Sequence, residues 1–301
     1  MPKFPSILAL AAVAGLTLAG CTSSPDPAPT DNRPVVLATF TVIADMAQVV
    51  AGDDLRVESV TRPGAEIHDY EPSPQDLRRG QGAQLILENG LGLETWFQRF
   101  TQDIDAPTVT LSEGVTPIPV ASGEYTGRDN PHAWMSPIVA QTYVKNIVTA
   151  FSTLDPQNAA GYRERGEAYS RELGSVASEL SAALETIPEN RRFLATCEGA
   201  FSYLARDVGL DEGFLWGVNQ ENEGTPQQIS GLIREVRERE VPTIFCESTV
   251  NNSAQRQVAA DSGAQLGGLL YVDSLSDGPP VGSYLDLLRH DAQVIAEGLT
   301  R

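Results

Sequence analysis

Two histidines and three carboxylates fall at loop positions. His68 lies in a loop after an apolar run typical of a strand, and His132 precedes a segment of helical periodicity. Glu198, Glu247 and Asp273 each directly follow an apolar run that is typical of a buried strand. In open parallel sheets, ligands bind beyond the carboxyl ends of the strands. Neutral imidazoles and carboxylates together suit a divalent cation of borderline or hard character, and two ionised carboxylates lower the cost of burying its charge. The pattern is compatible with a metal site. By spacing alone, surface histidines and carboxylates that cap helices would look the same.

Catalytic motifs are not visible in the sequence: there is no Ser-His-Asp order, P-loop, dinucleotide fingerprint or HExxH. Two histidines and two carboxylates can also form a hydrolytic metal site, which keeps an open coordination position. Such a site would need a general base, and Glu247 is the one further candidate. We therefore predict that the protein is not an enzyme, with a metal-dependent hydrolase as an alternative.

Short apolar runs alternate with segments of helical periodicity, which is typical of parallel sheets covered by helices. Strands are expected at 35–40, 55–61, 84–89, 107–115, 192–197, 214–218, 242–248 and 264–272. Helices are expected at 41–52, 73–83, 94–102, 137–155, 198–209, 225–240, 252–263 and 283–299, with one long helix at 156–184. The pattern predicts an α/β protein of two lobes, each a parallel sheet with helices on both faces. The lobes would cover residues 35–154 and 189–301, with the connecting helix in 155–188.

The N-terminal segment has the features of an export signal. Lys3 precedes an apolar run at 7–19, which is shorter than the roughly 20 residues of a membrane span. Leu-Ala-Gly-Cys at 18–21 resembles a bacterial lipobox, in which the cysteine is lipidated. Residues 1–20 would then be a lipoprotein signal peptide. Residues 21–34, rich in proline, serine, threonine and aspartate, would form a disordered tether from the lipid on Cys21.

Two further cysteines and the net charge limit the remaining possibilities. Cys197 and Cys246 each end a short apolar segment, so we expect two buried free thiols, although an oxidising compartment would permit a disulfide. With 21 basic and 40 acidic residues, the chain has a formal net charge of −19. Phosphate backbones would repel such a chain, which argues against a nucleic-acid partner.

Between about Val35 and Leu299 the sequence resembles the solute-binding lipoproteins of bacterial ABC importers for manganese and zinc. Six segments carry the resemblance, in the family's order: 68–76, 130–137, 198–203, 223–226, 245–248 and 271–274. Matched residue by residue, the resemblance implies four metal ligands: His68, His132, Glu198 and Asp273. It places Glu247 beside them as a nearby polar residue rather than as a ligand.

The resemblance also implies a metal, partners and a location. Zinc-type members tend to have histidine at the third ligand position and often carry a histidine-rich loop, whereas here Glu198 stands at that position and residues 121–131 contain no histidine. Manganese is thus expected, with zinc or iron(II) as alternatives. We expect a monomer that delivers its metal to a permease and its ATPase. It would be anchored by lipid to the outer face of the cell membrane, or be periplasmic. The linking helix would be rigid, and a surface adhesin remains an alternative function.

Overall fold

The computed structural model describes residues 31–301, except for 69, 98–103, 124 and 219–223, and leaves the side chain of Leu77 undescribed. The predicted signal peptide, the lipidation site at Cys21 and most of the predicted tether lie outside these residues. Arg33–Arg301 form one compact unit. In the described part of the chain, none of the helices combines the length and apolar character needed to cross a bilayer.

The N-terminal lobe, as we call the part from β1 to α4, contains a four-stranded parallel sheet with the order β2-β1-β3-β4. Its strands are β1 (Val35–Ala38), β2 (Arg56–Ser59), β3 (Ala83–Glu88) and β4 (Thr108–Thr110). Its helices are α1 (Thr41–Ala51), α2 (Pro74–Arg79) and α4 (Pro137–Leu154). Strand β1 is buried along its whole length, as its β-branched and apolar residues predict.

The C-terminal lobe, from β5 to α9, has two parallel pairs of strands, β5-β6 and β7-β8. The strands are β5 (Phe193–Glu198), β6 (Asp211–Trp216), β7 (Thr243–Glu247) and β8 (Gln265–Leu270). The helices are α6 (Ser202–Val208), α7 (Pro226–Glu238), α8 (Ser253–Ser262) and α9 (Tyr284–Leu299). Helix α7 begins as predicted, with Thr225 as its N-cap, Pro226 in its first turn and a capping box completed by Gln228.

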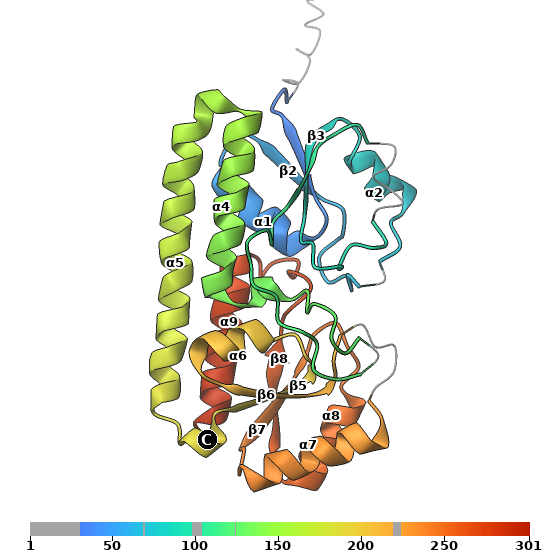
Figure 1. Cartoon of the computed structure of the whole chain (residues 1–301), viewed down its shortest axis with the longest axis vertical. Coiled ribbons are helices and arrows are strands. Elements are labelled where there is room, and N and C mark those ends of the chain that lie inside the picture. The colour runs from blue at the N-terminus through green and yellow to red at the C-terminus, as the bar shows by residue number, and fades with distance from the viewer. Residues whose placement is uncertain (1–30, 69, 98–103, 124, 219–223) are drawn as a thin grey trace, which may run out of the picture. The chain divides into compact units, whose positions relative to one another are not determined.

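Helix α5 (Ala159–Glu185) is the predicted long helix. It packs against α4 and α1 of the N-terminal lobe and against α6 and α9 of the C-terminal lobe, so it runs alongside both (Figure 1). The predicted fold class is therefore confirmed. The residue boundaries of the lobes stay a prediction.

Residues 94–97 of the helix expected at 94–102 form turns, and most of the rest lies outside the described residues.

The expectation of free thiols is wrong, because Cys197 and Cys246 form a disulfide. Strands β5 and β7 lie side by side and bring the two Cα atoms to 4.9 Å, within the range that a disulfide spans. The sequence could not show which strands are neighbours.

Candidate metal centre

Strand ends and the loops beside them bring four of the predicted residues together. His68 lies in the loop after β2, His132 precedes the short 3-10 helix Ala133–Met135, Glu198 ends β5, and Asp273 follows β8. All four are buried, with exposed fractions from 0% to 6%. His68 and His132 belong to the N-terminal lobe, and Glu198 and Asp273 to the C-terminal lobe.

The side-chain nitrogen and oxygen atoms of this cluster converge. The Nε2 atoms of His68 and His132 are 3.1 Å apart. Asp273 Oδ1 is 3.9 Å from Nε2 of His68 and 3.8 Å from Nε2 of His132. Glu198 Oε1 is 3.7 Å from Nε2 of His68. A cation placed among these atoms would meet imidazole nitrogens and carboxylate oxygens together, which is a ligand set for a divalent transition metal.

Each histidine is held by a defined local structure. Asn130 Oδ1 accepts from the backbone N–H of His132 at 3.0 Å and lies 2.9 Å from its Nδ1. The His68 backbone N–H donates to Glu66 Oε1 at 2.6 Å. Gly64, with φ of +76°, lies at a turn in the loop that carries His68. The backbone N–H of Gly64 donates to Leu275 O and to Ser274 Oγ in the C-terminal lobe. Glycine adopts this left-handed conformation at little cost.

Hydrogen bonds hold the backbone of Glu198 and the side chain of Asp273. Both oxygens of Glu247 accept from the backbone N–H of Glu198, at 3.4 and 3.3 Å, so Glu247 lies behind Glu198 on the neighbouring strand β7. Thr249 donates to Asp273 Oδ2 at 3.1 Å. Trp134 Nε1 donates to Val272 O at 3.0 Å, which ties the chain next to Asp273 to the N-terminal lobe.

Burial sets the protonation of the cluster in the absence of metal. It lowers the pKa of His68 to about 3 and that of His132 well below its ordinary value, with the neighbouring His68 adding to the latter effect. Both imidazoles are thus neutral, as metal ligands must be. Burial, and then the charges of Glu66 and Glu198, raise the pKa of Asp273 well above its ordinary value. Burial raises the pKa of Glu247 to about 8.

Sequence reasoning missed three residues around the cluster: Glu66, Asn130 and Thr249. Asn130 belongs to one of the family motifs, which assigns it no role, although an amide two residues before a histidine can contact its ring. Glu66 had a comparable signal, since it lies two residues before His68. Thr249 gave no such signal, because its contact with Asp273 depends on the pairing of β7 with β8.

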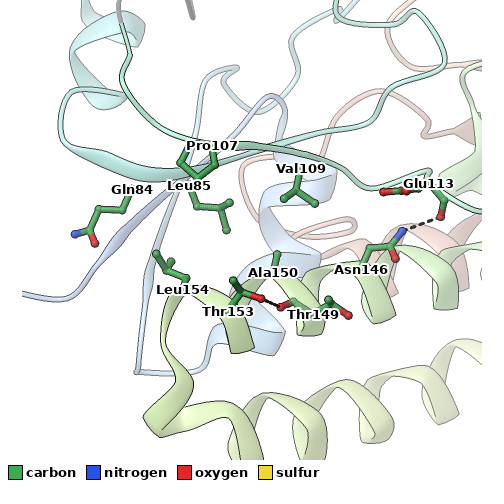
Figure 2. Close-up of a pocket in the computed structure, with 10 residues that line it drawn as sticks. All are labelled: Gln84, Leu85, Pro107, Val109, Glu113, Asn146, Thr149, Ala150, Thr153 and Leu154. Atoms are coloured by element: carbon green, nitrogen blue, oxygen red, sulfur yellow. Dashed lines mark hydrogen bonds between the residues drawn. The ribbon is translucent and has the colours of Figure 1, made fainter.

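A separate groove of about 320 Å³ lies between α4 and the edge of the N-terminal sheet, with Leu85, Val109 and Ala150 among its lining residues (Figure 2). Asn146 in its wall already donates to Leu111 O and Glu113 O. None of the clustered histidines or carboxylates lines this groove. It is therefore distinct from the metal centre.

Comparison with known proteins agrees with this geometry. The family model described as ZnuA, zinc-uptake complex component A, periplasmic, matches residues 36–298. The chain belongs to this family. The predicted resemblance to metal-binding proteins of ABC importers is thus confirmed.

Individual relatives are named for different metals. The iron-binding protein YfeA of Yersinia pestis is 43% identical, over 97% of this chain and 95% of its own length. The manganese ABC transporter substrate-binding lipoprotein PsaA of Streptococcus pneumoniae is 30% identical over 100% of both chains. The structure of the Mn-bound periplasmic metal-binding protein from Candidatus Liberibacter asiaticus is 35% identical, with a TM-score of 0.82, and covers 89% of this chain and 100% of its own.

Proposed function

We propose that this protein captures one divalent transition metal ion between its lobes, with His68, His132, Glu198 and Asp273 as ligands. The observation that carries the proposal is the convergence of Nε2 of both histidines with Glu198 Oε1 and Asp273 Oδ1, all from buried side chains. Burial of the whole set favours capture over turnover, because a hydrolytic metal needs a position open to water and substrate. We therefore propose no catalysis.

Manganese is the ion we propose first, with zinc or iron(II) as alternatives. Glu198 supplies an oxygen at the third ligand position, and oxygen ligands suit manganese better than zinc. A manganese-binding and an iron-binding relative align over nearly the whole chain. Zn²⁺ binds most nitrogen and oxygen sites more tightly than Mn²⁺. Selectivity for manganese would then depend on coordination geometry and on which ion is available.

We further propose that the protein works outside the cytoplasm as a monomer, tethered by lipid on Cys21, and passes its ion to a membrane permease driven by an ATPase. The lipobox-like 18–21 segment supports the anchor, and the lipoprotein relative supports both the anchor and the importer. In the producing cell, a Cys21→Ala variant should leave the membrane fraction. Retention of this variant in membranes would contradict lipid anchoring.

Metal binding itself is tested by thermal unfolding of the purified protein with and without Mn²⁺, Zn²⁺ or Fe²⁺, combined with elemental analysis. An ion present at 100 times its Kd should stabilise the native state by about 2.7 kcal/mol. The His68→Ala, Asp273→Ala double variant should lose this stabilisation. His290→Ala is the matched control, because His290 lies in α9 and its Nε2 contacts Leu269 O. No shift for any of the metals, or an unchanged shift in the double variant, would refute the proposal.

A further inference from the structure

Glu66 is the exposed neighbour of the buried cluster. One carboxylate oxygen of Glu66, one ring nitrogen of His68 and one carboxylate oxygen of Asp273 all lie within 4.8 Å of one another. Glu66 is exposed, whereas His68 and Asp273 are buried. This second group of possible ligand atoms therefore reaches from solvent to two of the four proposed ligands.

A hydrogen bond holds the Glu66 carboxyl at this position. Its Oε1 accepts from the His68 backbone N–H at 2.6 Å. The side chain therefore faces the cluster although it belongs to an exposed residue. A carboxylate oxygen of Glu66 and one of Asp273 lie within 4.8 Å of each other, and a divalent cation between them would attract both groups.

Asp273 shows that a ligand belongs at the inner end of this group. Its Oδ1 atom is buried and has no hydrogen-bond partner, yet it faces both histidine rings at 3.8 and 3.9 Å. A buried carboxylate oxygen without a donor is costly unless a ligand satisfies it. The inner cluster and the outer group share this residue, so an ion could pass between them without leaving Asp273.

We propose that Glu66, His68 and Asp273 form an outer cation site, through which a divalent metal enters and leaves the inner site. The inference rests on the proposed metal-binding function. An incoming hydrated ion first exchanges water for the Glu66 carboxylate. It then reaches His132 and Glu198 as Glu66 is released. Because Glu66 lowers the barrier in both directions, it affects the rates of exchange more than the affinity.

The test is the kinetics of Mn²⁺ exchange in a Glu66→Gln variant of the full folded protein. Glutamine keeps the acceptor for the His68 N–H and removes the charge. Trp134 provides an optical probe, since its ring lies 5.1 Å from that of His132. Association is followed after rapid mixing with Mn²⁺, and dissociation after mixing the loaded protein with excess chelator. Both rates should fall roughly tenfold, while Kd changes less than about threefold, as expected for a charge that acts on the path of the ion.

Glu71→Gln is the matched control, because Glu71 is an exposed glutamate later in the same loop. It removes the same charge and should leave dissociation unchanged. Equal slowing of association in both variants, with normal dissociation, would reduce Glu66 to a steering charge and overturn the inference. Faster dissociation with a weaker Kd would make Glu66 a permanent ligand, and unchanged rates would leave it no role, so both results also overturn it. Failure of the wild-type protein to bind Mn²⁺, Zn²⁺ or Fe²⁺ would instead refute the proposed function.

Discussion

At the scale of single residues, the hydrogen bonds of Asn130 fix the proton on His132. The Asn130 amide nitrogen donates to Gly199 O at 2.6 Å, so its oxygen faces His132 Nδ1. Nδ1 must therefore carry the proton, and Nε2 presents its lone pair to the cluster. Contacts of this kind orient metal-binding histidines and raise their basicity.

Replacing Asn130 should consequently weaken metal binding without touching a proposed ligand. We expect Asn130→Ala to lower the affinity for Mn²⁺ by roughly 10- to 100-fold, as measured by calorimetric titration. Asn130→Asp keeps an acceptor for Nδ1–H and should retain more of the affinity. Equal losses in the two variants would contradict the tautomer argument.

Glu247 gives the metal-free protein a pH dependence. Its pKa is raised from 4.5 to about 8, mainly by burial, so the folded state binds more protons than the unfolded state in that window. The free energy of unfolding therefore falls as pH rises from 4.5 to 8. Glu247→Gln should remove this part of the decline, on the order of a few kcal/mol. Chemical denaturation at pH 5 and pH 8 measures it, and an identical decline in the variant would exclude Glu247 as its source.

At the scale of elements, the disulfide joins the two strands that carry Glu198 and Glu247 at their ends. Gln255 also bridges these strands, since its amide nitrogen donates to Ala195 O and Phe245 O. Closing a loop between residues 49 positions apart stabilises the native state by about 4 kcal/mol in the chain-entropy description.

A Cys197→Ala, Cys246→Ala variant should therefore unfold at a lower denaturant concentration. Its free energy of unfolding should fall by about 2–4 kcal/mol. Metal affinity should fall as well, because the Glu198 backbone is held through Glu247 on the neighbouring strand. Denaturation curves of the variant and the oxidised wild type measure the first effect and metal titration the second. Equal stability of the two proteins would show that packing alone holds strands β5 and β7 together.

The contact between α4 and α5 depends on a glycine. A Cβ added at Gly166 would lie 2.4 Å from Val148 Cγ2, whereas one at Gly174 would approach Gln141 Nε2 at 3.7 Å. Valine has little rotational freedom in a helix. Gly174→Ala should gain about 0.5–1 kcal/mol from helix propensity, while Gly166→Ala should lose about 1–3 kcal/mol through overpacking. Thermal unfolding compares them, and equal stabilisation by both substitutions would contradict close packing at Gly166.

At the scale of the whole molecule, the site is shared between the lobes. His68 and His132 precede α5 in the chain, and Glu198 and Asp273 follow it. The loop of His68 also contacts the segment after Asp273 through Gly64 and Ser274. A bound ion would thus connect parts of the chain that are far apart in sequence.

Hydrogen exchange should reveal this connection. Saturating Mn²⁺ should slow amide exchange in 61–68 and 271–275 together, because both segments would be tied to one ion. Residues 170–180 of α5 serve as the internal reference and should change little. Protection confined to one lobe would mean that the ligands do not act as one set.

Several features were predictable because they depend on local chemistry. Alternating apolar and polar runs gave nearly every strand and helix, and Thr225-Pro226 marked the start of α7. The four proposed ligands were identified through ordered motifs around them rather than through composition. The strand limits were less well predicted, since pairing partners decide where a strand ends.

The sequence by itself determined the elements of this protein, its family and the residue types available for a metal. Periodicity, helix capping and short motifs depend only on residues that are close together in the chain. Only the tertiary structure decided which strands are neighbours. This placed Cys197 against Cys246, Glu247 behind Glu198 and Glu66 beside Asp273. The physical reason is that parallel strands are paired through long crossovers, so residues that meet at the site are brought together by packing rather than by spacing in the chain.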